Sequence, residues 1–177
     1  MHMSVTQILE KVVTMSFVFG ALTWSALAQT GTVDKVWVEY GVKVKNEVGI
    51  RIHTKFTAKN ALNVACSILA RAERVDGQSF SFTSNNFTTQ NGKQVQVTTY
   101  NTYATKDGKT ILISKPFTPP YDSADYPDTT LFFPYWAVRL RPESQNKMKL
   151  VVTLSANGKE FARSAAVDIG LSFGKAP

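Results

Sequence analysis

The chain has 177 residues, of which 44% are hydrophobic and 19% charged, and its formal net charge is +7. This size suits one domain with a single hydrophobic core, and the presence of only one cysteine excludes stabilisation by an internal disulfide. The basic residues are spread along the chain, which is typical of a soluble protein rather than of a dedicated anion-binding tail.

Residues 1–28 have the pattern of a signal peptide. A lysine precedes an apolar run over residues 12–22, and an Ala-Leu-Ala tripeptide ending at residue 28 has small residues at the two positions that a signal peptidase reads. The apolar run is too short for a convincing membrane span. We therefore expect residues 29–177 to form an exported domain, periplasmic or extracellular, with no stable membrane insertion and no nucleic-acid partner.

Apolar and polar residues alternate over residues 36–44 and again over residues 50–59, with a turn expected at 46–49 between the two runs. A period of two places alternate side chains on opposite faces of a strand, so this pattern predicts an antiparallel hairpin with one buried face. The first run is expected to direct four residues to the core: Val36, Val38, Tyr40 and Val42.

Seven further strands are predicted downstream, separated by Asp-Gly or Asn-Gly pairs that tolerate the positive φ angles of tight turns. Their ranges are 62–71, 79–83, 95–103, 111–114, 130–133, 147–154 and 161–167. Pro134 is placed to begin one helical turn, and helix is otherwise expected to be minor. The chain is thus predicted to be all-β: one antiparallel β-sandwich domain of about eight strands.

The predicted core continues through the second run of the hairpin and into the later strands. Cys66 alternates with apolar residues there, which favours a small buried side chain over a reactive thiol. The other expected members are Ile50, Ile52, Phe56, Leu62, Val64, Ile68, Leu150, Val152 and Leu154. Such a core can offset the conformational entropy of the chain without a covalent staple.

Two stretches resemble a family of bacterial β-sandwich domains of unassigned activity. The first runs from Val36 through Gly49-Ile50-Arg51-Ile52-His53-Thr54-Lys55-Phe56, and the second combines Phe117-Thr118-Pro119-Pro120-Tyr121 with Phe133-Pro134-Tyr135. The family occurs in exported proteins, alone or joined to peptidase-like or repeat modules, so the resemblance implies a sandwich fold and an accessory role. The chain departs from the family pattern at Pro120 and in a longer polar segment over residues 84–93.

Aromatic and charged side chains indicate a binding surface. Trp37 is expected on the solvent face of the hairpin together with Arg51, His53 and Lys55, because it alternates with the valines. Three further aromatic residues lie in or near polar segments: Tyr121, Tyr126 and Trp136. Rings beside polar groups suit a sugar or a partner protein, whereas burial under a neighbouring strand or loop would give Trp37 a purely structural role.

No catalytic set is apparent in the sequence. His53 is the one histidine outside the predicted signal peptide, and it alternates with two cations and has no expected acidic neighbour to orient it. A histidine in that setting favours a surface or cross-strand role. One histidine and one cysteine also exclude an ordinary His/Cys zinc site. The chain is therefore predicted not to be an enzyme, although a hydrolase built on His53 is the alternative.

Asp122, Asp125 and Asp128 form the one acidic cluster, spaced three residues apart in a segment expected to be a loop. Their oxygens could contribute to a calcium site, or each carboxylate could accept hydrogen bonds within a turn. The leading hypothesis is an exported, non-enzymatic accessory domain that binds a protein or glycan without a cofactor. The alternatives are a calcium-assisted carbohydrate-binding module and a small outer-membrane β-barrel.

Overall fold

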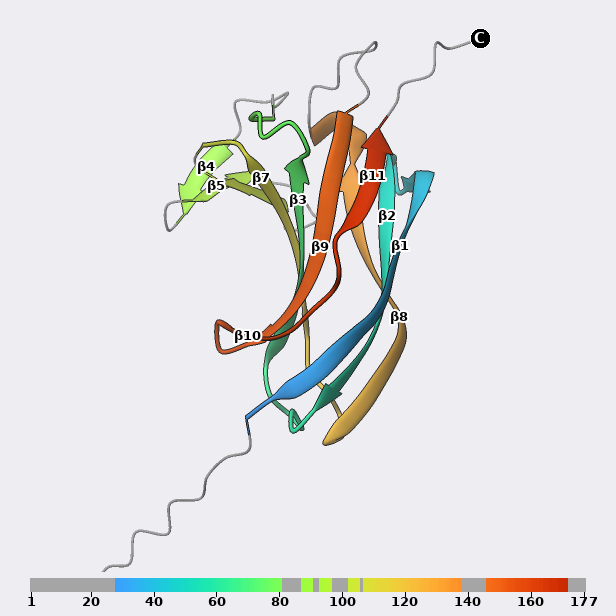
Figure 1. The fold of residues 1–177 in the computed structure, drawn as a ribbon, viewed down its shortest axis with the longest axis vertical. Helices are drawn as coiled ribbons and strands as arrows, with labels where there is room; N and C mark the ends of the chain where they lie inside the picture. The colour runs from blue at the N-terminus through green and yellow to red at the C-terminus, as the bar shows by residue number, and fades with distance from the viewer. Residues whose placement is uncertain are drawn as a thin grey trace, which may run out of the picture.

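The computed structural model describes residues 28–80, 87–90, 93–96, 102–105, 107–137 and 146–171. In this part of the chain two antiparallel sheets pack face to face, and the prediction of an all-β sandwich is confirmed (Figure 1). The predicted signal peptide lies outside the described residues except for Ala28, whose carbonyl oxygen accepts a hydrogen bond from Asn60 Nδ2. None of the helical structure in these residues has the length and apolar character needed to cross a bilayer.

The smaller sheet has three strands in the order β1-β2-β8, so β2 is its central strand. Its strands are β1 (Thr30–Val44), β2 (Glu47–Lys59) and β8 (Ser123–Pro134). The expected hairpin is confirmed, and its first strand begins earlier than the alternation indicates. Its turn is wrong in position: the chain reverses at Lys45 and Asn46, with Lys45 at a φ of 54°, and strand pairing resumes at Glu47.

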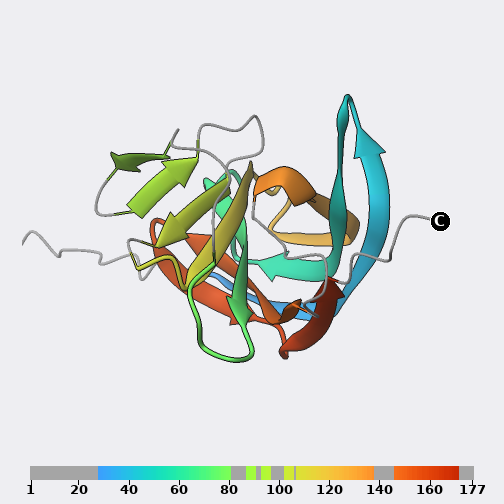
Figure 2. The ribbon, with the colours of Figure 1, turned by 90° about the horizontal axis from the view of Figure 1, so that it is seen from above.

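The larger sheet has eight strands, seven of them in the order β10-β9-β3-β7-β6-β5-β4. Their bounds are β3 (Cys66–Arg74), β4 (Phe87–Gln90), β5 (Lys93–Gln96), β6 (Thr102–Thr105), β7 (Thr110–Phe117), β9 (Asn146–Ala156), β10 (Lys159–Arg163) and β11 (Val167–Leu171). Strands β10 and β11 follow each other along one edge of β9, and between them the Ser164 hydroxyl accepts a hydrogen bond from the Val152 amide. Figure 2 shows β4 and β5 on one side of the sandwich and the β1–β2 hairpin on the other.

The core lies between the two sheets and is built from alternate residues of the long strands. The smaller sheet contributes Ile50, Ile52 and Phe56, and the larger sheet contributes Ile68, Ile111, Ile113, Met148, Leu150, Val152 and Leu154, all at most 1% exposed. Each such side chain contributes roughly 1.5–3 kcal/mol on burial, so the paired faces hold the sandwich together. Cys66 is 5% exposed, as predicted, and burial raises the pKa of its thiol.

Two expected core residues are on the surface. Tyr40 is 48% exposed because it lies in a bulge of β1, where Tyr40 and Gly41 together lie opposite Ile50. Gly41, within this bulge, has a φ of 68°. Leu62 is also 48% exposed, because residues 62 and 63 form a turn and β3 begins only at Cys66.

Other strand boundaries also differ from the prediction. The segment expected to be an acidic loop belongs to β8, since Ser123–Ala124 pairs with the end of β2. The expected strand over 161–167 is broken at residues 164–166, and the one over 95–103 contains parts of β5 and β6, with residues 97–101 outside the described residues. Residues 79–80 are not strand, and the rest of the strand expected at 79–83 is not described. The predicted helical turn is confirmed as η1 (Tyr135–Ala137).

Candidate functional site

The outer face of the smaller sheet is interrupted by two bulges that lie on either side of Lys55. In β1 the pairing with β2 shifts between Val33 and Lys35, which leaves Asp34 as an extra residue. In β8 the pairing shifts so that Pro127 and Asp128 together lie opposite Lys55. A bulge bends its strand and increases the local twist. Bulges in both strands that flank β2 at the same level deform this part of the sheet.

A cleft of about 380 Å³ opens at these bulges. It is lined by Asp34, Lys55, Phe56, Thr57, Asp125, Tyr126 and Pro127, and we call it the bulge cleft. The residues come from all three strands of the smaller sheet. The strand register therefore forms the cleft, and no loop has to close to complete it.

The polar groups of the bulge cleft are arranged around one lysine. Thr57 donates a hydrogen bond of 2.7 Å from Oγ1 to Oδ1 of Asp125, and Thr32 donates one of 2.7 Å to Oδ1 of Asp34. Each carboxylate keeps further acceptor capacity, because an ionised carboxylate has about four lone-pair sites. Lys55 is exposed and forms no ion pair with any residue that the structure describes. Its three N–H donors are therefore available to a ligand.

Next to the cleft, His53 lies between two carboxylates. Its Nδ1 is 2.9 Å from Oδ1 of Asp128, and its Nε2 is 3.5 Å from Oε2 of Glu39. The expectation that His53 has no acidic neighbour is wrong, because the β8 bulge turns Asp128 toward the ring. The His53 side chain is only 13% exposed.

Trp37 is also tied into this cluster. It lies opposite His53 in the strand register, and the two rings stack with centroids 4.9 Å apart and an interplanar angle of 11°. The ammonium of Lys35 lies 5.2 Å from the Trp37 ring centroid, and Arg51 Nη1 lies 3.1 Å from Oε2 of Glu39. Trp37 is half-buried, and its stacking on His53 already uses one face of the ring. It therefore serves mainly to hold the wall beside the cleft.

The other predicted aromatic residues do not join this cluster. Tyr126 lines the bulge cleft and is partly buried against the core, with its ring stacked on Phe56 at 4.5 Å and edge-on to Phe117 at 5.3 Å. Burial raises the pKa of the Tyr126 phenol, and nearby Cys66 adds to the effect. Tyr121, 69% exposed, and Trp136, 40% exposed, lie at opposite ends of β8.

The three predicted calcium ligands are not brought together. Asp128 pairs with His53 and Asp125 with Thr57, and Asp122 precedes the first residue of β8. No group of three or more His, Cys, Asp or Glu side chains suited to a metal ion occurs within the part of the chain that the structure describes. The calcium hypothesis therefore has no support in the geometry of this segment.

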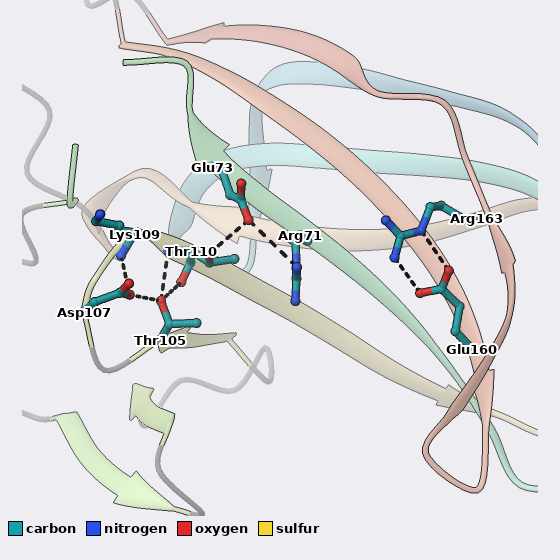
Figure 3. Close-up of polar contacts among 8 residues, drawn as sticks. All are labelled: Arg71, Glu73, Thr105, Asp107, Lys109, Thr110, Glu160 and Arg163. Carbon is teal, nitrogen blue, oxygen red and sulfur yellow. Dashed lines mark hydrogen bonds and ion pairs between the residues drawn. The ribbon is translucent and has the colours of Figure 1, made fainter. Parts of the chain in front are cut away.

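The outer face of the larger sheet also carries charges, and several of them are paired with one another (Figure 3). Arg163 makes two hydrogen bonds to Glu160, at 2.8 and 2.9 Å. The bond from Arg163 lowers the pKa of the Glu160 carboxyl, with a further contribution from nearby Arg71. Glu73 accepts a hydrogen bond from Thr110 and lies 3.9 Å from Arg71. Of these contacts only the Thr110–Glu73 bond joins two strands, because Glu160 and Arg163 both lie in β10 and Arg71 and Glu73 both lie in β3.

Sequence reasoning named Lys55 and Tyr126 as binding residues and Asp125 as a metal ligand, but it missed Asp34, Thr57 and Pro127. In β1 the side chain of Val33, at an odd-numbered position, packs against the core, and after it Val36 and Val38, at even-numbered positions, do so. A change of this kind is typical of a bulge, and Asp34 lies where it occurs. Pro127 within a strand also signals a bulge or an edge, since proline cannot donate to the sheet ladder. These two signals could have located the cleft before the structure did.

Comparisons of the chain with models of protein families, with curated proteins and with solved structures found no match.

Proposed function

We propose that this chain is an exported, non-enzymatic accessory domain that binds a protein or glycan partner through the outer face of its smaller sheet. The observation that carries the proposal is the bulge cleft, a concave site formed by strand register and containing a lysine without an ion pair among the described residues. Small-molecule and partner sites are concave and hold a few convergent polar groups, and this cleft has both properties.

The contacts of His53 favour binding over hydrolysis. A histidine that activates a nucleophile must contact a hydroxyl or thiol through one ring nitrogen while an acid orients the other. Both ring nitrogens of His53 face carboxylates, those of Asp128 and Glu39. His53 also does not line the bulge cleft. The Asp128–His53 pair therefore fits a role in holding the wall of the site.

The predicted signal peptide and the sequence resemblance to a family of accessory domains are consistent with an accessory role. A domain of that kind, joined to a peptidase-like or repeat module, would bring the module to its target. The bulge cleft offers a place for that contact without any metal ion, because its polar groups are a lysine, two carboxylates and a threonine hydroxyl.

The proposal is tested by screening the purified protein against a glycan array and, after cross-linking, against proteins of the cell envelope. Lys55→Glu reverses the charge at the centre of the cleft, and Lys149→Glu makes the same change in β9 of the larger sheet, where the side chain is also exposed. We expect Lys55→Glu to abolish partner capture and Lys149→Glu to retain it. Equal capture by both variants, with their folding verified by circular dichroism, would show that the partner does not bind at the cleft.

A further inference from the structure

The bulge cleft also indicates which kind of ligand it takes. Resting on the function proposed above, we propose that the cleft binds a neutral or amino-bearing sugar ring and discriminates against anionic sugars. The ring would lie between Asp34 and Asp125 and over the side chain of Lys55. This preference is opposite to the one suggested by the net charge of the chain, which is +7.

The side chains that line the cleft set its local charge. Its lining contains two carboxylates, Asp34 and Asp125, and one ammonium, that of Lys55. An anionic group entering the cleft would meet two carboxylates and one ammonium among the lining side chains, while the ammonium of Lys35, opposite Lys55 in the register, lies over the Trp37 ring. Coulomb interactions with these lining groups outweigh those with distant lysines, because salt screens charges that are more than about 10 Å apart. The dispersed bases therefore do not make this site an anion site.

The hydrogen-bonding groups of the cleft match those of a sugar. A sugar hydroxyl both donates and accepts, so it pairs best with a site that offers carboxylate acceptors beside an ammonium donor. Asp34 and Asp125 are each fixed by one threonine hydroxyl and keep acceptor capacity, while the ammonium of Lys55 supplies donors. Two vicinal hydroxyls could donate to one carboxylate and accept from Lys55. A protonated amino group on the ring would add a charge-assisted bond to either carboxylate.

The volume and the apolar surface of the cleft also suit a sugar ring. A volume of about 380 Å³ is close to the lower end of the range for small-ligand sites and suits one or two sugar rings. Pro127 and the methylene groups of Lys55 provide apolar surface for the C–H face of a ring. Trp37 does not serve as the stacking platform, since its ring is engaged by His53.

The experiment measures binding of individual sugars to the purified protein by ligand-observed NMR and calorimetry. The probes are glucose and N-acetylglucosamine as neutral rings, glucosamine as a cationic ring and glucuronic acid as an anionic one. We expect the neutral or cationic rings to bind, and glucuronic acid to bind about tenfold more weakly or not at all. Tighter binding of glucuronic acid than of the other three would overturn the inference.

Variants assign the binding to the cleft. Asp125→Asn keeps the size of the side chain and removes its charge, and Lys55→Gln removes the ammonium. Each should weaken binding of the preferred ring roughly tenfold, because hydrogen bonds to charged groups are the stronger class. The matched control is Asp168→Asn, an exposed aspartate in β11 of the larger sheet, which should bind like the parent protein. Unchanged binding in both cleft variants would overturn the assignment.

A failure of the sugar inference can be told apart from a failure of the proposed function. If none of the four sugars binds and Lys55→Glu still abolishes capture of a cross-linked protein, the cleft recognises a polypeptide, and only the sugar inference is lost. If no sugar binds and the Lys55→Glu variant captures its partners as well as the Lys149→Glu control does, both are lost.

Discussion

The outer faces of the two sheets both carry charged residues but arrange them differently. On the larger sheet Arg163 is joined to Glu160 by two hydrogen bonds, and Glu73 is shared by Thr110 and Arg71 (Figure 3). On the smaller sheet two bulges open a cleft around Lys55, which has no ion pair among the described residues.

The difference arises from the regularity of the strands. Strands β3, β7 and β9 pair without a shift in register, and across them Thr110 bonds to Glu73 and Ser67 to Ser155. The Glu160–Arg163 pair lies instead within β10, where the pairing with β9 shifts between Glu160 and Ala162. The bulges of β1 and β8 redirect the side chains around Lys55. Within the regular strands Thr110 bonds across to Glu73, whereas at the bulges of the smaller sheet Lys55 has no ion pair among the described residues. The following predictions test this contrast, from the largest expected effect to the smallest.

The largest effect should come from Gly49→Ala in the smaller sheet. A Cβ at Gly49 would lie 2.2 Å from the carbonyl oxygen of Phe133 and 2.8 Å from Cζ of Phe132, so the β2–β8 pairing would have to shift. Overpacking of this kind lowers the free energy of unfolding by about 1–3 kcal/mol or more. We expect the upper end of that range, because the clashing atom is a backbone oxygen that cannot rotate away. Chemical denaturation measures the loss.

Gly170→Ala in β11 of the larger sheet is the matched control for this change. A Cβ there meets nothing within 4 Å, and the free energy of unfolding should therefore be nearly unchanged. Equal losses in the two glycine variants would contradict the claim that the β2–β8 contact is the tight one.

Next in size is His53→Ala, which removes the residue that joins Trp37, Glu39 and Asp128. Loss of an aromatic stack costs about 0.5–1.5 kcal/mol, and loss of the bond to Asp128 adds to it, for an expected total of about 1–2 kcal/mol. The indole should also become more exposed, which shifts its fluorescence emission to longer wavelength.

The fluorescence change is assigned to Trp37 by repeating the comparison in a Trp37→Phe background, where the shift should disappear. A shift that persists there would place the change at another tryptophan of the chain, Trp24 or Trp136. A parent-like free energy of unfolding in His53→Ala would show that the cluster does not hold the wall of the cleft.

The regular hairpin and the core could be predicted from the sequence because both depend on period-two alternation, which is a local property. Ile50, Ile52 and Phe56 are buried as this pattern requires. A bulge adds a single residue and leaves the composition unchanged, so the exposure of Tyr40 was missed. Only the pairing with the neighbouring strand shows that Tyr40 and Gly41 together lie opposite Ile50.

The site was harder to predict than the fold, because it depends on pairing between distant segments. Asp128 reaches His53 across 75 positions of sequence, and Asp125 reaches Thr57 across 68. Reading Asp125 and Asp128 together as metal ligands was natural in a loop, but within β8 they contact different partners. The aspartates and Pro127 of this segment are typical of a loop, but here they lie in a bulged strand at the edge of the smaller sheet.

A smaller effect is expected from the Glu160–Arg163 pair, and it should depend on pH. Arg163 lowers the folded-state pKa of the Glu160 carboxyl below its usual value of 4.5. The unfolded chain therefore binds this proton first as the pH falls, so the stabilisation is present above the unfolded-state pKa and is lost as the pH falls through the folded-state pKa. Because both side chains are largely exposed, the contribution is within the range of surface ion pairs, about 0–1 kcal/mol.

This dependence is measured by comparing the free energy of unfolding of the parent and Arg163→Met between pH 7 and pH 3. The difference between the two proteins should shrink with acidification. A constant difference over this range would mean that Arg163 stabilises β10 through packing of its methylene groups and not through the carboxylate.

The smallest effect on stability is expected from Lys55→Gln, and it is the one that most sharpens the contrast between the two faces. Lys55 is exposed and has no ion pair in the described part of the chain, so its removal breaks no contact and should change the free energy of unfolding by less than about 0.5 kcal/mol. If Lys55→Gln destabilises the protein more than Arg163→Met does at pH 7, the lysine is part of the structure of the smaller sheet, and its ammonium is not free to bind a ligand. A neutral result combined with lost ligand binding would show that the bulges position Lys55 for recognition, because the fold itself gains nothing from its charge.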